Sequence, residues 1–223
     1  MKKTDIVMLE ENLPFWNRLS EKEKSLLADS AVPVRYDKDT AVHTADFECI
    51  GILLVRSGTL RVYMLSEDGK EITLYRISSG DVCVLSAACV LQAITFDVCI
   101  DAVTDCDVIQ ISSAAFSKIM EGNVYAEAFA YKLATERFSD VMWAMQQILF
   151  MSFDRRLATF LIDESAARGS EAVKMTHEEI ARMMGSAREV VTRMLKYFSS
   201  EGWVELSRGM VKILDRKKLM ELT

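Results

Sequence analysis

The segment from residue 175 to residue 202, MTHEEIARMMGSAREVVTRMLKYFSSEG, constrains the fold more than any other part of the chain. It contains two helix-start signals ten residues apart. Thr176 and Ser186 are each followed three residues later by a glutamate, which is the spacing of a capping box. Gly185 lies between the two signals and marks the point where one helix ends and the chain turns. The segment therefore predicts two short helices joined by a tight turn.

Apolar residues in this segment recur with the period of an α-helix. The first helix has Ile180, Met183 and Met184 on one face. The second helix has a longer apolar face, made by Val190, Val191, Met194, Leu195 and Phe198. Two short helices that cross at a glycine turn form a helix-turn-helix, whose second helix can enter the major groove of DNA.

Three charged residues lie in the first two turns of the predicted second helix, off its apolar face: Arg188, Glu189 and Arg193. Arginine can bind guanine through two hydrogen bonds, and glutamate can accept one from the cytosine amino group. These residues are therefore the candidates for base recognition. The alternative is that they form an ordinary solvated helix face. The residues expected to contact DNA phosphates are Thr176, His177, Ser186, Thr192, Arg208 and Lys212.

The sequence WVELSRGMVKILD follows this motif and consists of two short alternating apolar runs around Arg208-Gly209. This pattern predicts a β-hairpin. A helix-turn-helix followed by such a hairpin is a winged helix, and its wing would bring Arg208 toward the phosphate backbone.

The charge distribution agrees with a division into two parts. The whole chain of 223 residues has a net charge of −6. From residue 151 onward there are 13 Lys and Arg against 11 Asp and Glu, so the first 150 residues carry −8. Between Arg182 and Lys218 nine basic residues face four acidic ones. Binding to phosphates depends on a local basic patch, so the overall negative charge does not exclude a nucleic-acid partner.

The segment from Val32 to about Ile111 has the texture of many short strands separated by turns. Glycines recur every 11 residues at Gly58, Gly69 and Gly80. Strands are predicted at Ile50–Val55, Leu60–Leu65, Ile72–Ile77, Val82–Leu85, Phe96–Val103 and Val108–Ile111. Short strands at this spacing, with no helices between them, predict a sandwich or jelly-roll barrel and argue against a parallel α/β sheet.

A long uninterrupted helix is predicted after the barrel, from Val124 to about Met151. Five of its residues step by 4-3-4-3, which is a heptad seam: Ala134, Phe138, Val141, Met145 and Ile148. Two interpretations remain, a helix packed only on its own barrel and a helix that also pairs with a second copy. Apolar and aromatic residues on more than one face favour the homodimer, and two-fold pairing suits recognition of a palindrome.

The composition predicts a cytoplasmic protein with reduced thiols. The apolar runs are too short and too interrupted to span a bilayer, and acidic residues stand near the N-terminus where a signal peptide needs an apolar run. The five cysteines are odd in number and contain no Cys-x-x-Cys pair. We therefore expect no membrane association and no disulfide framework.

The chain resembles the cAMP receptor protein/FNR family of bacterial transcription regulators over almost its full length. THEEIARMMGSAREVVTRMLKYF resembles the helix-turn-helix of that family, and GTLRVYMLSEDGKEITLYRISSGD resembles its cyclic-nucleotide-binding-type barrel. The resemblance implies an α+β protein with a jelly-roll effector barrel (residues 1–122), a dimerisation helix (123–151) and a C-terminal winged helix-turn-helix (152–223). It also implies a homodimer that binds palindromic promoter DNA, contacts RNA polymerase and responds to a signal in the barrel.

Two features of the family pattern are missing. Cyclic-nucleotide binders of the family carry a Gly-Glu pair and then an Arg-Ser pair, yet here no Arg or Lys lies between Arg76 and Lys118. Burial of a cyclic phosphate without a cation is costly, so we expect no cAMP binding. The N-terminal cysteine cluster of FNR is also absent, because residues 1–48 contain no Cys. The effector is therefore unknown from the sequence.

The candidate effector pocket is the run after the last of the periodic glycines: Val82, Cys83, Leu85, Ser86 and Cys89. Four cysteines fall within a span of 24 residues that begins in this region. One hypothesis is therefore a redox, metal or haem sensor. The other is that the thiols serve only as small apolar side chains. A thiol enzyme is a third, less favoured reading. No spacing typical of metal ligands or of a catalytic set is present, so we expect no enzymatic activity and no metal site.

Overall fold

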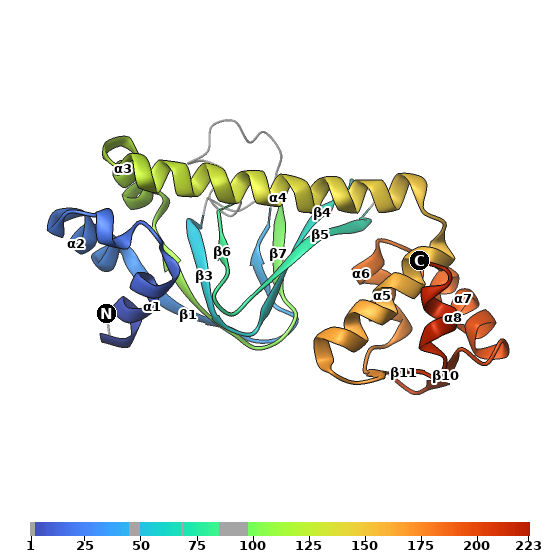
Figure 1. Ribbon diagram of the computed structural model, residues 1–223. Helices are drawn as coiled ribbons and strands as arrows, with labels where there is room; N and C mark the ends of the chain where they lie inside the picture. The colour runs from blue at the N-terminus through green and yellow to red at the C-terminus, as the bar shows by residue number, and fades with distance from the viewer. Residues whose placement is uncertain (1–2, 45–49, 68, 85–97) are drawn as a thin grey trace. The chain divides into compact units, whose positions relative to one another are not determined.

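The computed structural model describes residues 3–44, 50–67, 69–84 and 98–223 (Figure 1). The chain divides into two compact units. The first comprises Met1–Met64 and Leu74–Val141, and the second comprises Leu65–Thr73 and Met142–Thr223. Among the described residues, no helix is both long enough and apolar enough to cross a membrane.

The first unit begins with helices α1 (Lys3–Asn12), η1 (Trp16–Arg18) and α2 (Glu21–Ser30). Helix α2 starts at a complete capping box. The Ser20 hydroxyl accepts a hydrogen bond from the Glu23 amide, and the Glu23 carboxylate accepts one from the Ser20 amide at 2.7 Å. Leu27 on this helix is fully buried in the core.

The strands of the first unit form two four-stranded sheets, ordered β1-β8-β3-β6 and β2-β7-β4-β5. They are β1 (Ala31–Tyr36), β2 (Ala41–His43), β3 (Ile52–Ser57), β4 (Thr59–Leu65), β5 (Glu71–Ser78), β6 (Val82–Cys83), β7 (Cys99–Ala102) and β8 (Cys106–Ile111). The pairings of β1, β2, β3, β4 and β6 with their neighbours are antiparallel. This is the predicted jelly-roll barrel, and the prediction missed only β1 and β2 among these strands.

One side of the first sheet is covered by the N-terminal helices. Ile52 and Leu54 on β3 lie beside Ile109 and Ile111 on β8, and all four are buried in one cluster with Phe116. Alternate residues of a strand point to opposite faces, so the residues between these four face the other side of the sheet. The first unit thus has a core between its sheet and its helices.

The second sheet contains a buried ion pair between adjacent strands. Arg61 on β4 lies opposite Asp101 on β7, and both side chains are buried. The Arg61 Nε donates to Asp101 Oδ1 at 3.0 Å and to Oδ2 at 3.2 Å, and Nη2 donates to Oδ2 at 2.6 Å. The guanidinium carbon also lies 4.1 Å from the centre of the Tyr63 ring. Such paired contacts offset the cost of removing both charges from water.

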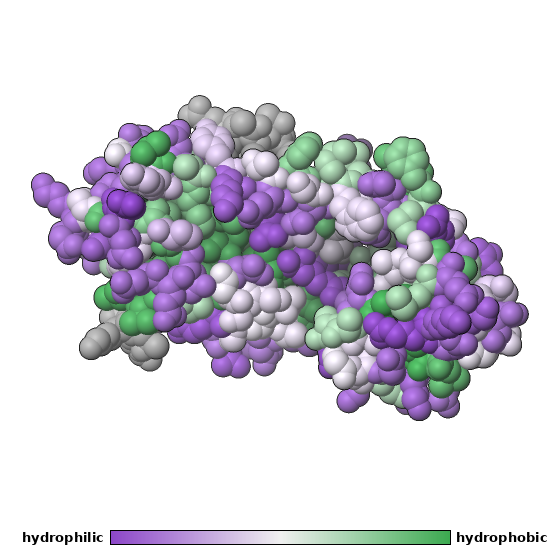
Figure 2. Space-filling model, viewed as in Figure 1, coloured by the Kyte–Doolittle hydropathy of each residue, from purple (hydrophilic) through white to green (hydrophobic). Residues whose placement is uncertain are grey.

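Helix α3 (Ser113–Gly122) is followed at Asn123 by the long helix α4 (Val124–Phe150). The extent of α4 agrees with the sequence prediction. Of the five seam residues, Phe138, Met145 and Ile148 are exposed, and Ala134 and Val141 are half-buried. Figure 2 shows hydrophobic residues gathered over the C-terminal half of α4. An exposed apolar row of this kind on a helix marks an interaction surface.

The C-terminal segment contains helices α5 (Phe153–Arg168), α6 (His177–Met184), α7 (Arg188–Ser200) and α8 (Arg216–Met220). Strands β9 (Ala172–Val173), β10 (Val204–Ser207) and β11 (Met210–Ile213) make a sheet of order β10-β11-β9. The predicted hairpin at Arg208-Gly209 is β10–β11. The prediction missed β9, which adds a third strand, and it also missed α1 and α8.

The prediction of two capping boxes is half wrong. Thr176 caps α6 as expected, but α7 begins one residue later than the Ser186 signal implies. Its N-cap is Ala187, and no side-chain hydrogen bond caps it. Ser186 is part of the turn, because its amide donates to the Ala181 carbonyl at 3.0 Å and completes the end of α6. The spacing of a hydroxyl and a glutamate alone could not distinguish these two roles.

We predict that Thr176→Ala and Ser186→Ala have different effects on stability. Loss of the Thr176 cap should destabilise the protein by about 1 kcal/mol, because the Glu179 amide loses its acceptor. Ser186→Ala should leave the urea-unfolding midpoint nearly unchanged, because this hydroxyl caps no helix. Equal effects of the two substitutions on the midpoint would contradict the helix starts described here.

Candidate nucleic-acid interface

The turn between α6 and α7 fixes the relative direction of the two helices. Gly185 ends α6 in the left-handed conformation, with φ 61° and ψ 44°. A side chain is disfavoured at this backbone geometry, so glycine is the residue that allows the turn. Thr176 holds the other end of α6, since its hydroxyl accepts from the Glu179 amide at 3.1 Å. The helix-turn-helix is therefore defined at both ends of its first helix.

One face of α7 is buried in the core of the second unit. Val191, Leu195 and Phe198 are fully buried, and Met194 packs against the same cluster. Val190 is only half-buried. The cluster also contains Ile180 of α6, so the two helices share one apolar core. The packing leaves the opposite face of α7 to solvent.

The three candidate base-recognition residues all lie on this open face of α7. Arg188, Glu189 and Arg193 are exposed. The Arg188 Nε lies 3.9 Å from a carboxylate oxygen of Glu178 on α6, and both side chains are largely exposed. An exposed pair of this kind contributes at most about 1 kcal/mol, so it leaves Arg188 available to another partner.

A hydrogen bond links the first turn of α6 to the middle of α7. The Nδ1 atom of His177 lies 3.0 Å from the Thr192 hydroxyl. Burial lowers the pKa of His177, and the positive charges of Arg188 and Lys196 lower it further. Lys196 is exposed and was missed by the sequence reasoning. Its position one helical turn after Thr192 was the available signal.

The hairpin β10–β11 carries two further basic residues. Ser207 and Met210 pair across its tip, and Gly209 adopts a left-handed conformation with φ 70°. Arg208 at the tip and Lys212 on β11 are exposed. The hairpin therefore presents cations in the way that a wing needs to contact a phosphate backbone.

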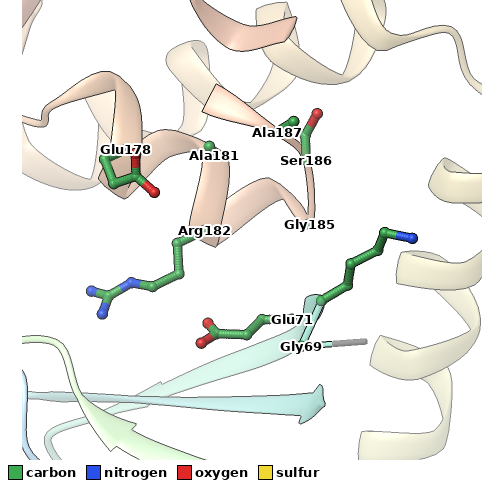
Figure 3. Close-up of a pocket in the computed structure, with 9 residues that line it drawn as sticks. Gly69, Glu71, Glu178, Ala181, Arg182, Gly185, Ser186 and Ala187 are labelled. Atoms are coloured by element: carbon green, nitrogen blue, oxygen red, sulfur yellow. The ribbon is translucent and has the colours of Figure 1, made fainter. Parts of the chain in front are cut away.

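A pocket of about 340 Å³ within the second unit lies against the turn between α6 and α7 (Figure 3). Its lining comes from Gly69, Lys70 and Glu71 and from the outer side of α6 and the turn, namely Glu178, Ala181, Arg182, Gly185, Ser186 and Ala187. Ser186 is half-buried here, whereas Arg188 is open to solvent. Ser186, one of the predicted phosphate-contacting residues, thus lines this hollow.

The candidate effector residues are only partly visible in the structure. Val82 and Cys83 form β6 and are buried, whereas Leu85, Ser86 and Cys89 lie outside the described residues. Cys83, Cys99 and Cys106 are not part of disulfide bonds, and all three are buried. No group of three or more metal-binding side chains occurs in the part of the chain that the structure describes.

Cys106 is held by two backbone contacts. Its thiol lies 3.1 Å from the Thr104 carbonyl and 3.4 Å from the Thr59 carbonyl. Burial raises the pKa of Cys106, so the reactive thiolate is disfavoured. This environment favours the packing role of Cys106 over a redox role.

The fold and the exposed basic face together define a winged-helix DNA-binding protein with a barrel of the cyclic-nucleotide-binding type. Comparison with known families agrees. The model of the Crp-like helix-turn-helix domain matches residues 155–222, and that of the cyclic nucleotide-binding domain matches residues 33–123. The chain belongs to the Crp/Fnr family of transcription regulators and is a DNA-binding transcription regulator.

Similar proteins support this assignment over most of the chain. A solved structure from Eubacterium rectale ATCC 33656, assigned to the Crp/Fnr family, is 44% identical, with a TM-score of 0.91, and covers 95% of this chain and 98% of its own. The transcriptional regulator SdrP of Thermus thermophilus is 27% identical over 75% of this chain and 81% of its own. The transcriptional activator protein anr of Pseudomonas aeruginosa is 27% identical over 77% of this chain and 72% of its own length.

Proposed function

We propose that the protein is a cytoplasmic homodimer that binds palindromic promoter DNA through α7 and is controlled by an effector in its barrel. The observation that carries this proposal is the division of α7 into two faces. Val191, Leu195 and Phe198 are fully buried, while Arg188 and Arg193 are exposed. A helix held in this way can place its charged residues against base edges without any change in its core. The protein would act as a regulator and not as an enzyme.

Base recognition is assigned to Arg188, Glu189 and Arg193. Arg188 and Glu189 are the first two residues of α7, and Arg193 lies in its second turn. The N-terminal turns of a recognition helix are the part that reaches base edges. The pairing rules and the family resemblance point to half-sites containing TGA, with centres about one helical turn apart.

Phosphate contacts are assigned to the surroundings of α7. Thr176 and His177 lie at the start of α6, Ser186 in the turn, and Thr192 on α7. Arg208 and Lys212 would act from the wing, and Lys196 joins this set because it lies near His177. Helix starts and exposed cations are the usual phosphate-binding groups.

Dimerisation is assigned to α4, as the predicted division of the chain into residues 1–122, 123–151 and 152–223 implies. Phe138 is 64% exposed, and Met145 and Ile148 on the same seam are 45% and 39% exposed. Ala134 and Val141 are the other two residues of this seam. A second copy of α4 would bury the row, because heptad seams pack into one another. The dimer would set two recognition helices at the spacing of a palindrome.

The signal and the further partners follow from the family resemblance. We propose contact with RNA polymerase and an effector other than cAMP. No Lys or Arg lies between Arg76 and Lys118 to neutralise a cyclic phosphate. Selection of random duplexes by the protein, followed by gel-shift assays, tests the whole proposal. Failure to enrich any palindrome would contradict it.

We predict that Arg188→Ala and Glu189→Ala each weaken binding to the selected site by roughly 1–3 kcal/mol per half-site and relax specificity at one base pair. Arg208→Ala should weaken binding to all sequences alike and make the salt dependence shallower. Gel shifts with single-base variants of the site separate the two effects. An equal loss for every variant with Arg188→Ala would show a phosphate contact instead.

For the dimer, we predict that charged residues at Val141 and Met145 yield monomers with far weaker affinity for the palindrome. The reason is that two charges would be buried without partners in the seam. Light scattering reports the mass, and a gel shift reports the affinity. The matched control is Lys132→Glu, which changes charge at an exposed site of the same helix. A wild-type monomer with full affinity would exclude this interface.

We predict that DNA affinity increases as the pH falls from about 8 to about 6, through titration of a histidine. The pKa of His177 in the free protein is below its ordinary value of 6.5. A nearby phosphate raises this pKa, so DNA binding takes up a proton and acid favours the complex. His177→Gln should remove most of the pH dependence measured by fluorescence anisotropy. Persistence of the full pH dependence in this variant would exclude the phosphate contact.

A further inference from the structure

A pocket of about 440 Å³ lies in the first unit, between the segment that contains η1 and the N-terminal half of α4. The segment contributes Pro14, Phe15 and Arg18, and α4 contributes a stripe of residues that begins at Tyr125 and ends at Glu136. None of the lining residues that the structure describes belongs to a barrel strand. The pocket is therefore distinct from the barrel interior, and its volume is in the range of sites that hold small molecules.

The floor of the pocket is apolar and is part of the core. Phe15 is buried in the core cluster of the first unit, and Phe129 and Leu133 pack against the same cluster. The ring centres of Phe15 and Phe129 lie 5.2 Å apart, a distance at which aromatic rings attract one another. Close packing holds such side chains in place, so the floor offers a preformed aromatic surface.

The rim of the pocket carries two cations and one carboxylate. The guanidinium carbon of Arg18 lies 5.2 Å from the centre of the Tyr125 ring, which holds the positive charge at the pocket wall. This contact is with a ring face and not with a carboxylate, so it leaves the guanidinium donors available to a ligand. The Nζ of Lys132 lies 4.0 Å from a Glu136 carboxylate oxygen, and both side chains are largely exposed. The rim therefore keeps an excess of positive charge.

An aromatic floor beside an exposed cation suits a ligand with an apolar ring and one negative charge. A guanidinium matches a carboxylate well, because it can donate two parallel hydrogen bonds to it. We propose that this pocket binds a small aryl carboxylate, with its ring on Phe15 and Phe129 and its carboxylate on Arg18. Lys132 adds a second positive charge to the rim.

Pairing of α4 with a second copy, as in the proposed function, would leave this pocket open. Glu136 of the pocket lies two residues from both Ala134 and Phe138 of the dimer seam. Two residues correspond to about 200° around an α-helix, so the pocket stripe faces away from the seam. Only this compatibility rests on the proposed dimer. The binding itself does not.

The experiment compares three probes with the same naphthalene body by ligand-observed NMR, on the full chain at low salt without DNA. Naphthoate carries a negative charge, naphthylmethanol is neutral, and naphthylmethylammonium carries a positive charge. We expect naphthoate to bind about fivefold more tightly than the alcohol, and the ammonium to bind more weakly than both, because exposed charges act at this strength when salt does not screen them. Absence of naphthoate binding, or equal or tighter binding of either other probe, would overturn the proposal.

Removal of one charge tests the role of Arg18. Arg18→Gln should weaken naphthoate binding about fivefold and leave naphthylmethanol binding unchanged, so that the two affinities converge. The matched control is Lys118→Gln, which removes an exposed cation of the first unit outside the pocket and should change neither affinity. Unchanged naphthoate binding in Arg18→Gln would overturn the assignment, because the probe would then bind elsewhere.

Filling the pocket tests its place in the fold. Ala128 lines the pocket and is exposed, so Ala128→Trp puts a large ring in the hollow without entering the core. Naphthoate binding should fall at least about tenfold, and the Tm should stay near that of the wild type because the changed side chain is on the surface. Ala166→Trp makes the same change at an exposed alanine of the second unit and should bind normally. Full binding in a folded Ala128→Trp would overturn the proposal, and the exposed Arg18→Gln variant decides it if Ala128→Trp does not fold.

Discussion

The shared core of α6 and α7 is the constraint on which the DNA-binding part of the molecule depends. Gly185 lets the chain turn in a left-handed conformation, and the turn brings Ile180 into the cluster that buries Val191 and Leu195. Since an α-helix has only one face against its core, this burial decides which side chains stay outside. Val191 lies on the buried face of α7, so Arg188, which lies on the opposite face, is exposed to solvent. The packing of a few apolar side chains thus determines which charged side chains of α7 are exposed and available to a partner.

Much of this could be predicted from the sequence, because local patterns carry it. Alternation predicted most barrel strands, and the absence of Gly and Pro predicted the length of α4. Strands β1, β2 and β9 were missed because their sequences have no clear alternation and they pair with segments distant in the chain. The prediction that Ser186 caps α7 was wrong for a related reason. The spacing between a hydroxyl residue and a following glutamate is the same whether the hydroxyl residue caps the next helix or ends the preceding one. Among site residues, Lys196 was missed because its proximity to His177 depends on the packing of α6 on α7.

Two arginines of the first unit are in opposite situations: Arg61 on β4 is buried, and Arg137 on α4 is half-buried. Arg61 has its carboxylate partner in the adjacent strand and also lies over Tyr63, so its charge is compensated within the sheet. Arg137 is compensated on one edge by Asp140 and leaves its Nε without a partner among the described residues. The first arrangement holds β4 against β7. The second lies between a strand and a helix, because the Arg137 guanidinium of α4 lies over the Tyr75 ring of β5. No pattern along the sequence distinguishes these two arginines, because the difference depends on cross-strand register and on the approach of α4.

The start of α7 differs from the starts of α2 and α6, because no side chain caps it. The first amides of any helix need acceptors, and the positive end of the helix dipole favours an anion there. Under the proposed function, a phosphate of bound DNA would supply that anion at α7. The sugar–phosphate backbone of a bound duplex would then complete the recognition helix itself, so that the first turn of α7 becomes more ordered when it is occupied. Exchange of the backbone amide hydrogens of Arg188 and Glu189 would slow in the complex. Part of the binding enthalpy would then come from ordering the first turn of α7 and not from hydrogen bonds to bases.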